Sequence, residues 1–310
     1  MATALVTGGA GFIGAHLARA LLAEGWDVHV ADDLSTGSAA NVPMGAELHT
    51  VDLARGEGID ALPAAHFDAV CHLAGQSSGE KSFDDPGHDL DANARSTVLL
   101  GAWARERGVP VFVHASSMGV YGQPDASPVA EDAPLAPLSW YGASKRAAER
   151  ALDVVARAGG PRCVSLRMFS IYGPGQDLRE MRQGMVSIFL AMLLRGEEIV
   201  VHGPLDRARD FVYVDDCVEA WLRALGAEQA VGPLNVGTGT ATTVGEMVRL
   251  LCDLAGVADH PVRSQGTTPG DQFALAADTR RAHALLGWQA RTGLGDGLEA
   301  MLRWARDGRS

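Results

Sequence analysis

Residues 2–14 read ATALVTGGAGFIG, a short apolar run that ends in a series of spaced glycines. The apolar run is typical of a buried strand, and the residues after the glycines repeat at helical spacing. In such a strand–turn–helix unit, Gly8 lets the chain turn, Gly11 lets a phosphate approach the backbone, and Gly14 lets the helix pack closely. Free N–H groups at the start of the helix attract anions. The stretch therefore predicts a dinucleotide-binding turn.

The residues that follow the turn strengthen this prediction. A second strand is expected over 28–31, and Asp32 comes directly after it. An acid at this distance from the glycines binds the hydroxyls of the adenosine ribose. Asp32 would repel a 2′-phosphate, and no Arg or Lys lies between Arg19 and Arg55 to neutralise one. We therefore expect NAD rather than NADP, and we prefer this interpretation to a structural turn beside a solvated acid.

The composition limits the classes of partner and compartment. The formal net charge of -12 opposes attraction to nucleic acid or to an anionic membrane, so neither is expected as a partner. The cysteines are scattered, which suggests neither a metal site nor a disulfide framework and fits a reducing compartment. The longest apolar run, residues 185–194, is too short to cross a bilayer. We expect a cytoplasmic protein without a metal site.

Strand and helix patterns alternate along the first half of the chain. Further strands are predicted at 47–51, 69–73, 111–115 and 163–169, and helices at 89–106 and from Ser139 onward. Strands that end in small or acidic residues indicate a parallel sheet with a ligand at its C-terminal edge. The fold class predicted is α/β, a Rossmann-type doubly wound parallel sheet with a smaller C-terminal substrate-binding α/β domain.

The pattern changes from Tyr172 onward, where short strands and loops surround the predicted helices. The 310 residues, with 47% hydrophobic content, allow two parts that share a cleft. We expect residues 1–170 to form the NAD-binding domain, with 212–237 returning to it. Residues 171–310 would mainly form the substrate-binding domain, and the active site would lie between the two.

Tyr141 and Lys145 lie four residues apart at the start of a predicted helix and so share one face. A neighbouring cation stabilises a phenolate, which lowers the pKa of a tyrosine from about 10 and makes it a usable base. Such a pair is often only a surface contact. Ser117, at the end of the preceding strand, is placed to hydrogen-bond the same substrate oxygen. Together with the dinucleotide turn, these three residues predict a hydride-transfer site.

At this point the chain resembles the extended short-chain dehydrogenase/reductase family, most closely its nucleotide-sugar members of the UDP-glucose 4-epimerase type. The resemblance covers essentially the whole chain. It rests on Thr7 to Gly14, Asp32 to Gly37, Asp52-Leu53, His72 to Gly75, Ser116-Ser117, Val120 to Gly122, Tyr141 to Lys145, Leu166 to Ser170, Tyr172 to Pro174 and Arg209 to Phe211.

The resemblance implies a set of cofactor and substrate residues. The NAD site would comprise Gly8, Gly11, Phe12, Ile13, Gly14, Asp32, Asp33, Leu34, Ser35, Thr36, Gly37, Asp52, Leu53, Leu73, Ala74, Gly75, Asn93, Tyr141, Lys145 and Phe169. The substrate site would comprise Ser117, Tyr141, Ser170, Arg179, Val186, His202, Arg209 and Asp271. In it, Arg209 would pair with the diphosphate, Asp271 would bind the ribose, and Val186 and His202 would flank the base.

Two departures from the family pattern concern the substrate. The family often has an Arg where this chain has Thr268, so a second contact to the diphosphate must come from elsewhere or be absent. Ser170 stands where most members have Asn, which opens the shape near the pyranose. Relatives that act on UDP-glucuronate can carry a hydroxyl residue there, and Arg179 or Arg182 could then meet a carboxylate.

The expected activity is NAD-dependent inversion of C4 of a UDP-hexose or UDP-hexuronate through a 4-keto intermediate. The substrate can be of the UDP-glucose, the UDP-N-acetylglucosamine or the UDP-glucuronate type. A 4,6-dehydratase or UDP-glucuronate decarboxylase carries acidic residues just after the strand-end Ser/Thr, where this chain has Met118-Gly119. A dinucleotide-sensing protein without turnover typically loses the Tyr/Lys pair.

The resemblance also implies a homodimer through the helix 89–106 and the helix from Ser139. Its apolar contacts would come from Val98, Leu99, Ala102, Leu152 and Val155.

Overall fold

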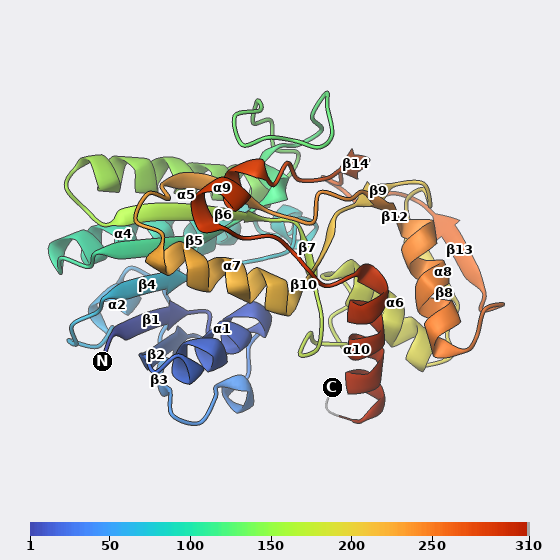
Figure 1. Ribbon diagram of the computed structural model, residues 1–310, viewed down its shortest axis with the longest axis horizontal. Coiled ribbons are helices and arrows are strands. Elements are labelled where there is room, and N and C mark those ends of the chain that lie inside the picture. The colour runs from blue at the N-terminus through green and yellow to red at the C-terminus, as the bar shows by residue number, and fades with distance from the viewer. Residues whose placement is uncertain (309–310) are drawn as a thin grey trace.

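Seven parallel strands form the central sheet of the computed structural model, which describes residues 1–308 (Figure 1). The strands are β1 (Thr3–Thr7), β2 (Asp27–Asp32), β3 (Glu47–Thr50), β4 (Ala69–His72), β5 (Val111–Ser117), β6 (Arg162–Met168) and β11 (Gly232–Val236). Their order is β11-β6-β5-β4-β1-β2-β3, so the winding reverses between β1 and β4. Open α/β sheets bind ligands at this switch point, beyond the carboxyl ends of the strands. The predicted fold class is confirmed.

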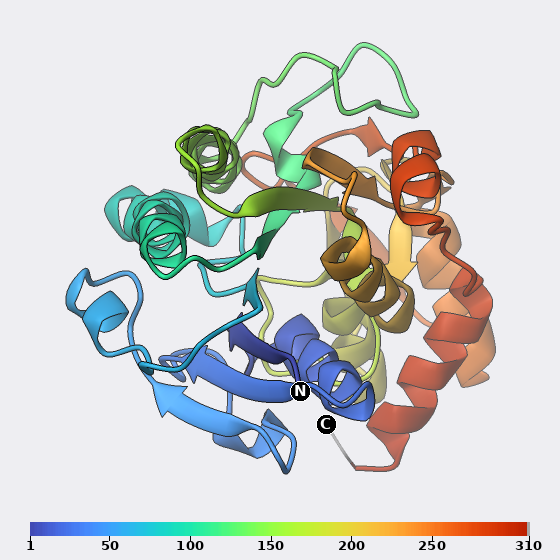
Figure 2. The same ribbon diagram turned by 60° about the vertical axis from the view of Figure 1, so that its left-hand side comes forward.

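Helices cover both faces of the sheet, which is why central strands such as β1 and β4 are almost entirely buried. Helices α1 (Phe12–Ala23) and α7 (Val214–Gly226) pack on one face (Figure 2). Helices α4 (Ser96–Glu106) and α5 (Trp140–Arg157) pack side by side on the other, with the short α2 (Glu57–Asp60) nearby. Residues such as Leu5, Val30 and Val113 are fully buried between these layers.

The helix predicted over 89–106 is interrupted by a wider turn. It consists of α3 (Pro86–Leu90), a π-helical turn at Asp91–Arg95, and α4. The Asp85 side chain caps the start by accepting a hydrogen bond from His88 N at 2.9 Å. Turns of this kind are frequent at functional sites, and this one carries Asn93.

The remaining elements form a smaller lobe with its own core. Phe189, Leu190, Met247, Leu251 and Met301 are among its buried residues. Its helices are α6 (Met185–Leu194), α8 (Val244–Ala255) and α10 (Leu294–Arg306), while α9 (Arg280–Leu286) packs against the main sheet. Its strands pair as β10 (Phe211–Tyr213) with β7 (Ser170–Tyr172), β8 (Ile199–His202) with β13 (Val262–Gln265), and β9 (Ala208–Arg209) with β12 (Thr242–Thr243) and β14 (Ala274–Leu275).

Several ion pairs join loop 180–183 of the smaller lobe to residues 77–84 of the larger one. Arg182 pairs with Glu80 at 2.8 Å and with Asp84 at 2.6 Å, and Lys81 pairs with Glu180. Ser78 Oγ also donates a hydrogen bond to the backbone oxygen of Arg182 at 2.9 Å.

Among the helices of residues 1–308, none has both the length and the apolarity that crossing a membrane requires.

Candidate active site

The glycine turn lies between β1 and α1, at the switch point of the sheet. Gly8 has a φ of +70°, and a Cβ there would lie 2.6 Å from Ala74 N. A Cβ on Gly14 would lie only 2.8 Å from Gly9 Cα, so two of the predicted glycines are required by the protein's own packing. A Cβ on Gly11 would meet only the Gly8 oxygen at 3.3 Å. The start of α1 lacks a capping side chain, which leaves its N–H groups to a ligand.

Asp32 is 7% exposed and joins the end of β2 to this turn. Its two carboxylate oxygens accept hydrogen bonds from Ala10 N and Leu34 N, both at 2.9 Å. Burial raises the pKa of its carboxyl group, while both hydrogen bonds lower it. The predicted adenosine residues 32–37 fold back onto the turn, since Ser38 N donates to Ala10 O at 3.1 Å. Asp52 and Leu53 follow the neighbouring strand β3, at the same edge of the sheet.

Residues 73–75 follow β4 and meet Asn93 of the π-helical turn. Gly75 has a φ of +153°, and a Cβ there would overlap Asn93 Oδ1 and lie 3.4 Å from Lys145 Nζ. Asn93 is fully buried, and its Oδ1 has no hydrogen-bond partner among the described residues. Leaving a buried amide oxygen unpaired costs about 1–3 kcal/mol, which indicates a partner from outside the chain. The residues present therefore fit the nicotinamide end of a dinucleotide.

Ser117, Tyr141 and Lys145 come together beside this position. Ser117 ends β5, and Tyr141 and Lys145 occupy the first turns of α5, whose start is capped by Ser139 Oγ accepting from Gly142 N at 3.1 Å. Ser117 and the Tyr141 ring both border Gly119, since a Cβ built there would lie 3.5 Å from Ser117 Oγ and 3.6 Å from the ring. Lys145 Nζ lies 5.7 Å from the centre of the Tyr141 ring. The structure thus assembles the three predicted catalytic residues.

The sequence predicted that the neighbouring Lys145 lowers the pKa of Tyr141. For the protein without a bound ligand, this prediction is wrong. Burial raises the pKa of the phenol, although the Ser117 side chain lowers it. Burial also lowers the pKa of Lys145 to about 8, with Asp89 acting in the opposite direction. Spacing along a helix indicated the neighbouring charge but not the loss of water around both groups, which dominates here.

Asp89 is a candidate site residue that the sequence did not single out. It is fully buried and accepts hydrogen bonds from Ser144 Oγ at 2.7 Å, Gln76 Nε2 at 2.8 Å and Asn93 Nδ2 at 3.2 Å. These contacts fix the start of α5 and the Asn93 amide relative to each other. Its position four residues before Asn93 on one helix face was a usable signal. We regard Asp89 as a positioning residue.

A second buried network lies behind Ser117. Arg167 holds Glu149 through two hydrogen bonds, at 2.9 and 2.8 Å, and Glu149 also accepts from Ser116 Oγ at 2.5 Å. Arg167 also donates to the Tyr121 hydroxyl at 2.9 Å. The end of β5 is therefore tied to α5 and β6 on the side away from the reacting groups.

The smaller lobe contributes a cluster of two arginines and one acid. Arg209 and Arg207, on one side of the same short strand region, both pair with Asp271. Arg209 is 2% exposed, and burial lowers the pKa of its guanidinium. Arg207 lines a hollow of about 170 Å³ with Thr268 and Asp271, and its buried Nε has no partner among residues 1–308. Arg209 and Asp271 are predicted substrate residues, whereas Arg207 was not predicted from the sequence.

The other predicted substrate residues have varied surroundings. Ser170 begins β7 beside the buried Phe169. Val186 is 2% exposed within the core of the smaller lobe, so it offers almost no surface to a ligand. The His202 carbonyl accepts a hydrogen bond from Arg207 at 3.0 Å. The Arg179 side chain is 89% exposed and pairs with Asp177, away from the residues that converge at the site.

The fold and the site define the class of protein. A doubly wound sheet with a glycine turn, a strand-end serine and a Tyr-x-x-x-Lys helix is that of an extended short-chain dehydrogenase/reductase. Residues 4–237 match the NAD dependent epimerase/dehydratase family, and the chain belongs to this family. NAD is its cofactor, and the chain is an enzyme similar to UDP-glucose 4-epimerases. The family also includes dehydratases and decarboxylases.

Individual proteins match over nearly their full length. UDP-glucose 4-epimerase of Mycolicibacterium smegmatis is 36% identical over 98% of both chains. The solved structure of a Thermotoga maritima UDP-glucose 4-epimerase with UDP-glucose has a TM-score of 0.94 and 32% identity, covering 99% of this chain and 100% of that one. A Thermus thermophilus UDP-glucose 4-epimerase in complex with NAD has a TM-score of 0.91 and 36% identity, covering 98% and 99%.

Proposed function

We propose that the protein inverts C4 of a UDP-hexose through a 4-keto intermediate. The observation that carries the proposal is the convergence of Ser117, Tyr141 and Lys145 beside the unpaired Asn93 amide oxygen. NAD held by the glycine turn, Asp32 and residues 73–75 would supply the acceptor and donor for the C4 hydride. Tyr141 as phenolate takes the proton of the C4 hydroxyl and later gives it back, Lys145 stabilises the phenolate, and Ser117 holds the oxygen in line.

The residues after Ser117 favour epimerisation over the other reactions of the family. Loss of water from C5 and C6 needs an acid or base beside C6, and the residues that follow Ser117 are Met118 and Gly119. A Cβ on Gly119 would lie 3.5 Å from Ser117 Oγ and 3.6 Å from the Tyr141 ring. The small Gly119 and Ser170 leave room for the sugar to turn over between the two hydride transfers.

The ion pairs of the smaller lobe favour a neutral hexose over a hexuronate. Arg182, one candidate partner for a sugar carboxylate, is already paired with Glu80 and Asp84. Arg179, the other candidate, pairs with Asp177. We further propose that Arg209 and Arg207 bind the diphosphate, with Arg207 in place of the arginine that Thr268 replaces, and that Asp271 binds the ribose. We propose that residues 1–170 together with 212–237 bind NAD, and that residues 171–310 mainly bind the substrate. Residues 309–310 lie outside the described part of the chain.

Product analysis tests this proposal. The protein is incubated separately with UDP-glucose, UDP-N-acetylglucosamine and UDP-glucuronate without added reductant, and the products are separated by chromatography. We expect the C4 epimer of at least one neutral hexose, and no turnover by Tyr141→Phe although it still binds NAD. A 4-keto-6-deoxy sugar, a pentose, or no product from any substrate would contradict the proposal.

We also propose a homodimer through the outer faces of α4 and α5. Val98 is 44% exposed and Val154 is 67% exposed on these neighbouring helices. The expected contacts Leu152 and Val155 instead face the chain's own interior, because both lie against Gly101 of α4. Light scattering should give a dimer mass, Val154→Asp should give a monomer, and Val257→Asp on the smaller lobe should not. A monomeric native protein would overturn this proposal.

A further inference from the structure

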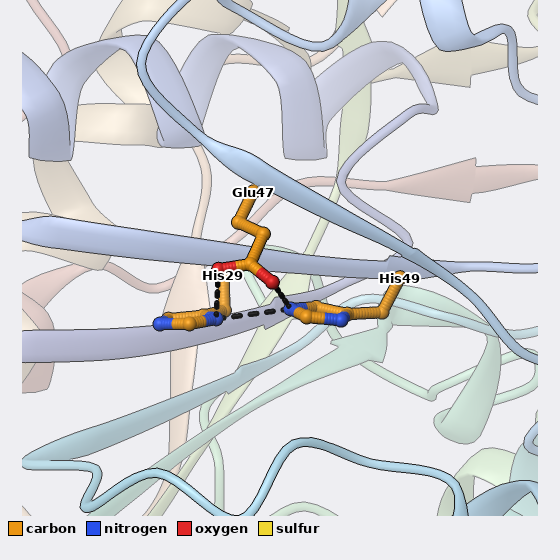
Figure 3. Close-up of side chains that lie close together, drawn as sticks. All are labelled: His29, Glu47 and His49. Carbon is orange, nitrogen blue, oxygen red and sulfur yellow. Dashed lines mark hydrogen bonds and ion pairs between the residues drawn. The ribbon is translucent and has the colours of Figure 1, made fainter.

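His29, Glu47 and His49 form a side-chain cluster at the edge of the sheet (Figure 3). His29 lies on β2, and the other two lie on the edge strand β3. In the parallel register His29 is opposite Glu47, and His49 is two residues further along β3. Residues two apart on a strand face the same side, so all three side chains share one face of the sheet.

Their donor atoms are spaced as the ligands of a small metal ion. His29 Nδ1 and His49 Nε2 share a hydrogen bond at 2.9 Å, whose proton a bound ion would replace, and the Glu47 carboxylate lies 3.7 Å from the first nitrogen and 3.6 Å from the second. Ligands about 2.0–2.1 Å from a tetrahedral zinc ion are roughly 3.3 Å from one another. We propose that His29, Glu47 and His49 bind one divalent transition-metal ion such as Zn²⁺.

The surroundings of His29 prepare its Nδ1 as a ligand. His29 is 8% exposed, and its ring packs edge-on against Phe67 at a centroid distance of 5.3 Å. Its other nitrogen, Nε2, lies 3.7 Å from the Asp27 carboxylate. A carboxylate near one imidazole nitrogen favours the proton there and leaves the lone pair on the other, as is usual around metal-bound histidines.

The ligand types and the access route restrict the metal. Two imidazoles and one carboxylate suit Zn²⁺, Co²⁺, Ni²⁺ or Cu²⁺ better than Mg²⁺ or Ca²⁺, which prefer oxygen ligands. The Glu47 side chain is 66% exposed, which leaves a solvent side for entry and for a water as fourth ligand. The bound ion links the four-residue edge strand β3 to β2. The link is made at His29, three residues before Asp32.

The test uses the full chain without an affinity tag, treated with a chelator and then titrated with Zn²⁺ in a calorimeter. We expect one ion per chain, and His49→Asn and Glu47→Gln each to weaken the binding at least tenfold. The control is His66→Asn: His66 is 74% exposed and lies 3.6 Å from a single acid, Asp68. Its binding should equal that of the native chain.

A second measurement reports the geometry directly. Co²⁺ bound to the native chain should give the intense visible absorption of a four-coordinate ion, and His49→Asn should lose it. The proposal is overturned if binding does not saturate, if His49→Asn binds as tightly as the native chain, or if His66→Asn loses as much affinity. A purely six-coordinate Co²⁺ spectrum would overturn it as well.

Discussion

Replacing Lys145 with methionine removes the buried ammonium beside the proposed base, Tyr141. Nζ lies 5.7 Å from the centre of the phenol ring. At an effective dielectric constant of about 20, a unit charge at that distance stabilises the phenolate by about 3 kcal/mol. This is about two pKa units, or roughly a hundredfold in the phenolate fraction. Because burial already raises the pKa of Tyr141, we expect Lys145→Met to lower kcat about a hundredfold near neutral pH.

The pH profile gives this prediction a second, independent readout. Burial lowers the pKa of Lys145 to about 8, so its positive charge is present below that pH and is lost as the pH rises through it. The difference between the native protein and Lys145→Met should therefore shrink above about pH 8. In the variant, the rate should simply rise with pH as Tyr141 ionises.

The assay is the initial rate of epimerisation of the best UDP-hexose, followed by chromatography over a series of pH values. Arg150→Met is the matched control, since Arg150 lies on the same helix with a side chain 77% exposed. Its rate should equal the native rate, and NAD binding by both variants should be measured separately. A kcat for Lys145→Met within about tenfold of the native value, or a gap that does not narrow above about pH 8, would refute the reasoning.

Three further predictions test the surroundings of the site. Asp89→Asn should lower the pH above which the Lys145 charge no longer aids the reaction, since the Asp89 charge raises the pKa of Lys145; an unchanged pH profile in a folded variant would contradict this. Asp32→Asn should reduce the preference for NAD over NADP at least about tenfold, measured as the ratio of the two Kd values, and an unchanged ratio would count against the ribose role. Arg167→Met should lower the free energy of unfolding by about 3–5 kcal/mol in urea titrations, because it leaves Glu149 buried and unpaired. Adding Glu149→Leu should restore part of the loss, whereas a further additive loss would show that the pair is not coupled.

The parts of the fold that local chemistry dictates were predictable. The glycine turn, the strand-end Asp32 and Ser117, and the Tyr141–Lys145 helix depend on residues that are close in sequence. Parallel strands bring their carboxyl ends to one edge, so the cofactor residues could be placed together without knowledge of packing. The short strand β13 was missed because its four residues, Val-Arg-Ser-Gln, are all exposed and form no apolar pattern.

Contacts between distant segments account for what the sequence did not predict. Arg207 meets Asp271 across 64 residues, and His29 meets His49 across 20 residues and two strands. Asp89 was missed for a different reason. Its spacing of four residues from Asn93 is visible in the sequence, but its burial against α5, on which its function depends, is not. The direction of the Tyr141 pKa shift was predicted wrongly for the same reason, since burial raises this pKa.

The proposed reaction requires that the site binds the nucleotide tightly and the sugar weakly. The two ends of the site differ in this way. The nucleotide is proposed to contact Arg207, Arg209 and Asp271, which form ion pairs with one another. Arg209 also donates a hydrogen bond to the backbone oxygen of Gln272 at 2.6 Å, which fixes its guanidinium. The sugar end is proposed to meet Gly119 and Ser170, which offer one hydroxyl group and no charge. Tyr141 and Ser117 would then act on whichever face of C4 the rotating sugar presents. Epimerisation in both directions would follow from one rigid set of catalytic groups and one mobile ring.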